Sequence, residues 1–263
     1  MDAMTTVLTP DGTRLYAEEQ GTGDPLVLLP GQGSSHLMWG RTIGLLAARH
    51  RVVVFDYRGT GKSGTPEDGW STRGFAGDAV AVLDALGIER AHVYGFSMGG
   101  RVAQWVAIDH PERVGALVLG ATTPGDAHGV PRPPHVDERL GAGGDLTEFL
   151  HNPGWARARL RVEGVCNDWR VGTSQRAALR HYRASQAHDS WDGLASITAP
   201  TLCVHGTEDV LNVVANSDLL AQRIPDARVH CIPGAQHAYF EEQEVEATKV
   251  VLDFLAEHPI VTG

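Results

Sequence analysis

The stretch Ala91-His-Val-Tyr-Gly-Phe-Ser-Met-Gly-Gly-Arg-Val-Ala103 decides how this chain is interpreted. Its first residues favour a short buried strand, and residues 98–109 have the apolar pattern of a helix. Between them, residues 95–99 match G-x-S-x-G, in which a serine occupies a sharp turn between a strand and a helix. Glycine is needed two residues to either side because a Cβ would collide with so tight a turn. The pattern predicts that Ser97 is a nucleophile, with the N-terminal N–H groups of the helix directed toward it.

Composition indicates a globular protein without a strong electrostatic partner. The 263 residues are 42% apolar and 21% charged, and they carry a net charge of −10. An acidic chain of this kind argues against nucleic acid or an anionic membrane as the main partner. No apolar run approaches the roughly 20 residues of a membrane-spanning helix. The first residues show no signal-peptide pattern. We therefore expect a cytoplasmic protein.

The cysteines and histidines do not form a metal-binding pattern. Three cysteines, Cys166, Cys203 and Cys231, are too few and too scattered for a disulfide framework or a metal site. Cys203 and Cys231 fall in predicted strands, so we expect both to be buried thiols. No H-E-x-x-H or comparable ligand spacing occurs. We expect no metal and no cofactor.

Strands and helices alternate over most of the chain, which predicts a doubly wound α/β fold with a mostly parallel sheet. An Asp11-Gly12 turn predicts a hairpin between the first two strands. The predicted strands are 5–8, 13–19, 25–29, 51–55, 92–94, 114–119, 200–204 and 228–232. The predicted helices of this unit are 39–49, 73–86, 98–109, 213–224 and 241–257.

The alternation stops between residues 122 and 196. This segment is rich in glycine and proline and contains no run typical of a buried strand. Helical patterns cover 146–150, 155–162 and 175–187. We interpret 122–196 as an inserted helical cap, and 1–121 with 197–263 as the core domain.

Gly61-Lys62-Ser63 resembles the end of a nucleotide-binding P-loop. A P-loop requires a glycine at position 56, where this chain has Asp56, and a helix directly after the serine. Residues 64–66 are Gly-Thr-Pro and would break that helix. A structured turn after a strand is the better interpretation.

Three predicted strands end in residues that together form a hydrolytic site. Ser97, Asp209 and His237 follow three different strands, and the carboxyl ends of parallel strands meet at one edge of a sheet. A serine hydroxyl needs a histidine to take its proton, and the histidine needs a carboxylate to fix its tautomer. Asp126 and Glu208 are the alternative acids.

These motifs resemble those of the α/β-hydrolases, in particular small serine esterases and lactonases such as 3-oxoadipate enol-lactonases and polyketide-tailoring methylesterases. The resemblance lies in residues 30–35, 55–63, 95–100, 205–209 and 234–237. It implies an eight-stranded sheet with an inserted cap, the triad Ser97–Asp209–His237, and an oxyanion hole formed by the backbone N–H groups of Gln32 and Met98. It also implies a structural role for His205. Many relatives have histidine at position 30, where this chain has proline.

The implied reaction is hydrolysis of a small carboxylic ester or lactone through an acyl-enzyme on Ser97. Large side chains near the motifs are candidates for the substrate pocket, although they are equally typical of a core: Trp39, Trp155, Trp169 and Tyr239. A perhydrolase or haloperoxidase-like activity, a carbon–carbon bond hydrolase and a cyclase would use the same triad. A non-enzymatic small-molecule receptor is the alternative from another class.

Overall fold

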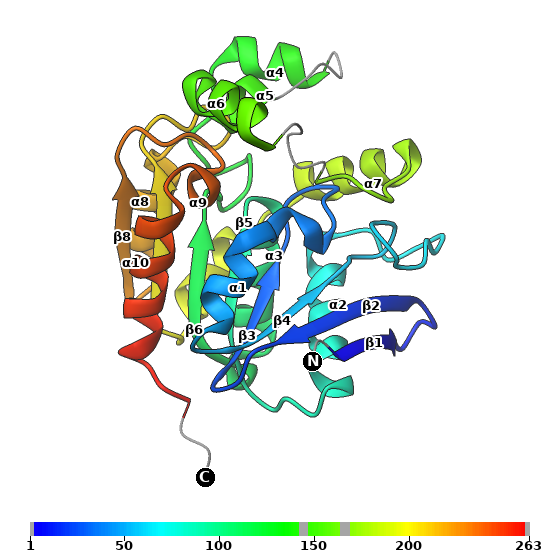
Figure 1. Cartoon of the computed structure of the whole chain (residues 1–263). Helices are drawn as coiled ribbons and strands as arrows, with labels where there is room; N and C mark the ends of the chain where they lie inside the picture. The colour runs from blue at the N-terminus through cyan, green and yellow to red at the C-terminus, as the bar shows by residue number, and fades with distance from the viewer. Residues whose placement is uncertain (1–2, 142–146, 164–168, 261–263) are drawn as a thin grey trace.

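An eight-stranded sheet forms the centre of the computed structural model, which describes residues 3–141, 147–163 and 169–260 (Figure 1). The strands are β1 (Ala3–Leu8), β2 (Arg14–Gln20), β3 (Pro25–Leu29), β4 (Arg51–Phe55), β5 (Ala91–Phe96), β6 (Val114–Gly120), β7 (Thr201–Gly206) and β8 (Ala227–Ile232). Their spatial order is β1-β2-β4-β3-β5-β6-β7-β8. β2 pairs antiparallel with β1 and β4, and all other neighbours are parallel. The predicted α/β fold with a mostly parallel eight-stranded sheet is confirmed.

The sheet separates two layers of core because successive side chains of a strand point to opposite faces. Val27 and Leu29 of β3 belong to one hydrophobic cluster, and Leu26 and Leu28 belong to the other. β5 and β6 are buried at every position, as expected for central parallel strands covered on both faces. The strand order reverses at β3, which lies between β4 and β5, so the carboxyl ends of these strands border the crevice where such sheets place their sites.

Helices cover both faces of the sheet. The first cluster includes residues of α2 (Thr72–Ala85), α3 (Met98–Asp109) and α8 (Ala215–Arg223), and the second includes residues of α1 (Gly40–Ala47) and α10 (Glu244–Ala256). The shorter pieces are η1 (His36–Trp39), η2 (Pro111–Arg113) and α9 (Tyr239–Glu242). Between β6 and β7 the chain forms α4 (Pro134–Gly141), α5 (Thr147–Leu150), α6 (Pro153–Glu163), α7 (Gln175–Gln186) and η3 (Trp191–Ser196). Figure 1 shows α4, α5 and α6 together beyond the carboxyl ends of the strands, and α7 apart from them.

Two expectations about the elements are wrong. Cys203 is buried, but Cys231 is exposed because β8 is the edge strand of the sheet and only its last residue is buried. The closing segment forms two helices instead of one, since Gln243 leaves helical geometry between α9 and α10, with φ −122° and ψ 50°. Helix α4 is an element that was not among the predicted helices. Cys166 lies outside the described residues.

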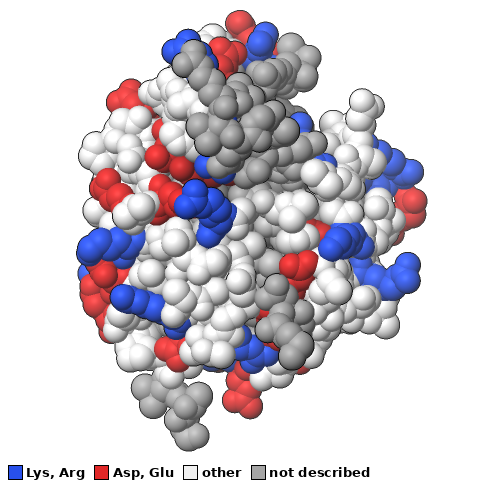
Figure 2. Space-filling view, in the orientation of Figure 1, with Lys and Arg blue, Asp and Glu red and all other residues white. Residues whose placement is uncertain are grey.

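The described surface has no dominant charge of one sign on the face seen in Figure 2, where acidic and basic side chains are interspersed. Exposed ion pairs of the described surface include Arg228 with Glu257 and Lys249 with Asp253. Among the described residues, no helix combines the length and the apolar character needed to cross a membrane.

Candidate active site

Ser97 lies on a strained turn between β5 and α3. Its φ of 55° and ψ of −116° are rarely adopted by residues other than glycine and cost about 1–3 kcal/mol. The turn is held by the Ser97 N–H, which donates to the Gly120 carbonyl at 2.8 Å. A Cβ at Gly95 would lie 2.2 Å from the Gly99 carbonyl oxygen. The glycine spacing is therefore a steric requirement of this turn.

The structure brings Ser97, His237 and Asp209 together from three different loops. His237 Nε2 lies 3.0 Å from Ser97 Oγ, and His237 Nδ1 lies 2.7 Å from Asp209 Oδ2. His237 and Asp209 are each 4% exposed, whereas Ser97 is partly accessible. Since Asp209 can only accept, His237 Nδ1 carries a proton and Nε2 is free to accept the serine proton.

Asp209 is more heavily hydrogen-bonded than the sequence suggests. Its Oδ1 accepts the backbone N–H groups of Leu211 and Asn212 at 2.8 and 3.0 Å. Its Oδ2 lies 3.0 Å from His205 Nε2 as well as facing His237. Burial alone would raise the pKa of this carboxyl, but the His237 charge and the bonds from both histidines hold the pKa well below its usual range. The carboxylate therefore stays ionised although it is buried.

His205 lies directly against Asp209, which goes beyond the structural role that the family resemblance implies. The ring is fully buried, and its Nδ1 lies 2.7 Å from Ser217 Oγ, while Nε2 also contacts the Asn212 carbonyl. It is a direct partner of the carboxylate that holds His237. The signal available in the sequence was its position at a strand end, four residues before Asp209.

The two alternative acids do not contact His237. Asp126 pairs with Arg101 at 3.3 Å. Glu208 is exposed, and its carboxylate contacts the hydroxyl of Thr207 at 3.5 Å.

The role of the two expected oxyanion donors stays a prediction. The backbone N–H groups of Gln32 and Met98 have no hydrogen-bond acceptor among the residues that the structure describes. Met98 opens α3 directly after Ser97, and Gln32 lies in the loop after β3. After Gln32, the loop is held by the His36 N–H, which donates to Asp56 Oδ1 at 2.8 Å. The same Asp56 carboxylate accepts the Lys62 N–H at 2.8 Å. A carboxylate therefore anchors the backbone of the Gly61-Lys62-Ser63 turn.

The four large side chains expected near the substrate differ in their solvent exposure. Trp39 and Tyr239 are fully buried in the core: the Trp39 ring packs 5.0 Å from Tyr94, whose hydroxyl is hydrogen-bonded to that of Tyr239 at 2.8 Å. Trp155 and Trp169 are partly accessible. Trp169 packs edge-on against the Phe96 ring, which in turn lies 4.9 Å from the His237 ring.

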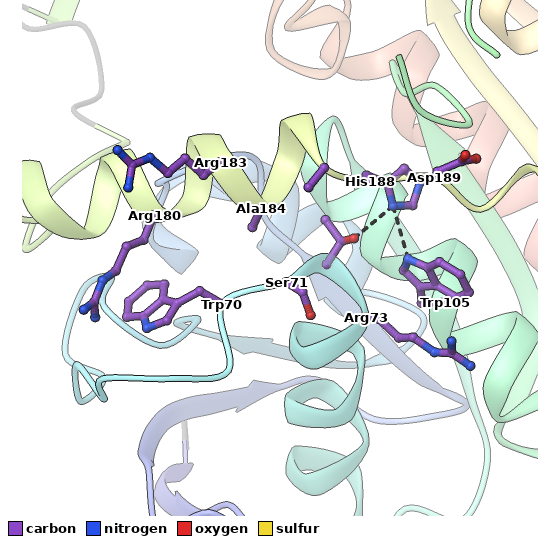
Figure 3. Close-up of a pocket in the computed structure, with 11 residues that line it drawn as sticks. Trp70, Ser71, Arg73, Trp105, Arg180, Arg183, Ala184, His188 and Asp189 are labelled. Atoms are coloured by element: carbon purple, nitrogen blue, oxygen red, sulfur yellow. Dashed lines mark hydrogen bonds between the residues drawn. The ribbon is translucent and has the colours of Figure 1, made fainter. Parts of the chain in front are cut away.

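A separate pocket of about 400 Å³ lies between α7 and the start of α2 (Figure 3). Trp70, Trp105, Arg183 and His188 are among the residues lining it. His188 Nδ1 accepts the Trp105 Nε1–H at 3.2 Å. None of the residues expected to take part in the reaction lines this pocket.

A family model described as the alpha/beta hydrolase fold matches residues 24–244. The chain belongs to the α/β-hydrolase family. It is 31% identical over 261 residues to a putative carbamate hydrolase RutD of Azorhizobium caulinodans, covering 92% of this chain and 95% of that protein. It is 32% identical over 271 residues to a 2-hydroxymuconate semialdehyde hydrolase of a Pseudomonas species, covering 94% and 92%.

The crystal structure of an enol-lactonase from Burkholderia xenovorans superimposes with a TM-score of 0.84 at 25% identity, covering 96% of this chain and all of that one. This family membership and these relatives make the chain an enzyme of the α/β-hydrolase class that acts on small molecules. The resemblance to esterases and lactonases drawn from the motifs is confirmed.

Proposed function

We propose that this α/β-hydrolase cleaves a small carboxylic ester or lactone through an acyl-enzyme on Ser97. The observation that carries the proposal is the continuous path from Ser97 Oγ through His237 to Asp209, at 3.0 and 2.7 Å. A neutral His237 accepts the serine proton at Nε2 while its Nδ1–H donates to Asp209. This arrangement activates a hydroxyl that is otherwise a weak nucleophile.

The reaction proceeds in two halves. Ser97 Oγ attacks the carbonyl carbon, the bond to the leaving alcohol breaks, and His237 gives that alcohol the proton. His237 then takes a proton from water, which attacks the acyl-enzyme and releases the acid with regeneration of Ser97. The N–H groups of Gln32 and Met98 stabilise the oxyanion in both halves, and each such donor is typically worth ~10²–10³ in rate.

The remaining expectations complete the proposal. Residues 122–196 act as a cap over the core domain of 1–121 and 197–263, and they contribute Trp155 and Trp169 to the substrate pocket. Trp39 and Tyr239 are buried in the core and would influence this pocket only through Phe96, which both contact and whose ring lies 4.9 Å from that of His237. The cytoplasmic location stays a prediction.

Fluorophosphonate labelling of the native protein and of Ser97→Ala, together with turnover of p-nitrophenyl acetate, p-nitrophenyl butyrate and γ-butyrolactone, tests the proposal. We expect Ser97-dependent labelling and turnover of at least one of these substrates. Full esterase activity in Ser97→Ala would overturn the mechanism. Absence of labelling combined with tight small-molecule binding would favour a receptor.

Carbon–carbon bond hydrolysis is a second candidate, because the relative that is 32% identical is named for the hydrolysis of 2-hydroxymuconate semialdehyde. The same triad would serve, so only substrates separate the two reactions. Ser97-dependent turnover of this semialdehyde at 100-fold or more the kcat/KM of any ester would replace the ester proposal. Peracid formation from acetate and hydrogen peroxide in excess of ester hydrolysis would instead indicate a perhydrolase.

A further inference from the structure

His181 of α7 is a buried histidine in contact with the loop that carries Gln32. Its ring is fully buried and stacks on Phe75 with centroids 4.9 Å apart and an interplanar angle of 26°. The Gly33 N–H donates to His181 Nδ1 at 3.4 Å, and His181 Nε2 lies 2.9 Å from the Arg58 carbonyl oxygen. One imidazole therefore joins two loops that follow the neighbouring strands β3 and β4.

The two contacts require one tautomer of a neutral ring. The Arg58 carbonyl can only accept, so Nε2 carries the proton and donates it. The Gly33 N–H can only donate, so Nδ1 must keep its lone pair. Burial lowers the pKa of His181 to about 4, which leaves the ring neutral and able to accept from Gly33 at pH 7.

Helix α7 packs directly on this loop. Gly33 has a φ of +65°, and a Cβ placed on it would lie 3.9 Å from the Cα of Ala178. The β6–β7 segment makes a second contact with the same loop, because the Ser35 N–H donates to the Trp169 carbonyl at 2.7 Å. Gly33 and Ser35, which follow Gln32, are thus held by residues that lie some 130 to 150 positions later in the sequence.

We propose that His181 is a positioning residue for the oxyanion hole, which fixes Gly33 so that the adjacent Gln32 N–H points at the developing oxyanion. The inference rests on the proposed function of Ser97 and Gln32. A donor stabilises a transition state only when it is already oriented before the charge develops, so the bond at Gly33 acts on rate more than on substrate binding.

The anchoring of α7 explains how this position is kept. Arg180, one residue before His181, donates to the Pro66 carbonyl at 2.7 Å and stacks over the Trp70 ring at 4.8 Å. Figure 3 shows the Arg180 side chain extending from α7 to lie beside Trp70, which belongs to the loop that leads into α2. The helix is therefore fixed to the core on one side and to the loop on the other.

The test compares His181→Phe, which keeps an aromatic ring against Phe75 but loses both hydrogen bonds, with His181→Gln, whose amide can accept and donate. The matched control is Phe75→Leu, which disturbs the same packing and leaves both bonds in place. We expect His181→Phe to lower kcat for p-nitrophenyl acetate about 10- to 100-fold with KM within about twofold, below the loss of ~10²–10³ for complete removal of a donor. His181→Gln should recover part of the loss, and Phe75→Leu should stay within about threefold of the native kcat.

Hydrogen exchange of the peptide covering residues 31–36 supplies a readout other than activity. We expect faster exchange in His181→Phe and no change in Phe75→Leu. Native kcat and unchanged exchange in His181→Phe would overturn the inference, as would an equal loss of kcat in Phe75→Leu. If the native protein has no Ser97-dependent turnover, the proposed function fails, and with it the inference, whatever the exchange shows.

Discussion

Replacing Asp209 with asparagine tests the charge relation within the triad without changing its shape. The two oxygens of Asp209 accept four N–H groups, two from the backbone and two from histidines. The asparagine amide has one oxygen, which can accept, and one NH₂, which can only donate. One of the two pairs of N–H groups must therefore face the NH₂ group. The backbone pair cannot rearrange, so the amide oxygen stays with Leu211 and Asn212, and the NH₂ faces His237 and His205.

His237 can satisfy this NH₂ only by moving its own proton from Nδ1 to Nε2. The proton then points at Ser97 Oγ, 3.0 Å away, where a lone pair is needed to accept the serine proton. An aspartate-to-asparagine change with this effect in a serine protease triad costs about 10⁴ in kcat. At about 1.4 kcal/mol for each factor of ten, the expected loss of transition-state stabilisation is about 5 kcal/mol.

The assay is the pre-steady-state release of p-nitrophenol from p-nitrophenyl acetate, with active sites titrated by the fluorophosphonate. Glu208→Gln is the matched control, because it makes the same chemical change one residue away on an exposed side chain. We expect native rates for the control and a loss of about 10³- to 10⁴-fold for Asp209→Asn. An acylation rate for Asp209→Asn within tenfold of the native rate would refute the assignment of Asp209.

Three further predictions concern the fold that holds the site. Gly99→Ala would place a Cβ 2.0 Å from a backbone carbonyl oxygen, so fluorophosphonate labelling should be lost, whereas Gly77→Ala, with nothing within 4 Å, should be tolerated. His92 is buried, and burial is the chief reason that its pKa is lowered to about 4. Between pH 6.5 and 4 the unfolded chain therefore binds a proton that the folded chain does not, so the free energy of unfolding falls as the pH drops toward 4. His92→Leu should therefore reduce the difference in unfolding free energy between pH 7.5 and 4.5 by about 2–3 kcal/mol in urea titrations; an unchanged difference would contradict this. Asp78→Ala removes the carboxylate 2.7 Å from the buried Arg58 guanidinium and should cost about 3 kcal/mol in the same assay, and a loss below about 1 kcal/mol would show that Asp11 replaces it.

The parallel core and the approach of Ser97, Asp209 and His237 to one another were predictable because each depends on local sequence and one topological rule. Runs rich in valine and leucine such as 51–55 and 114–119 are typical of buried strands, and the structure places β4 and β6 there almost to the residue. Polar residues following such strands must then meet at the carboxyl edge of the sheet. Strand ends and chain order thus place Ser97, Asp209 and His237 at one edge, while the choice of Asp209 over the neighbouring Glu208 rests on the family resemblance.

What the sequence could not give are contacts between segments that no local pattern relates. His181 lies 148 residues from Gly33, and a histidine on an amphipathic helix has no feature that marks it as a partner of a loop amide. The position of β8 at the sheet edge, which exposes Cys231, follows from strand order and not from strand composition. The break at Gln243, with φ −122° and ψ 50°, likewise has no marker in the local sequence, where no glycine or proline interrupts the helical pattern.

These long-range contacts bear on how one catalytic arrangement serves several reactions. The relatives are named as a putative carbamate hydrolase, an enol-lactonase and a 2-hydroxymuconate semialdehyde hydrolase, so the choice of substrate must come from residues outside the triad. In this chain the β6–β7 segment contributes Trp169 and His181, which are hydrogen-bonded to Ser35 and Gly33 in the loop after β3. A substrate that shifts this segment on binding would therefore also shift the loop that carries Gln32. Selection of the substrate and alignment of the Gln32 N–H would then both depend on one set of contacts. We therefore expect variants of α7 to change the ratio of kcat values for two substrates more than they change either KM.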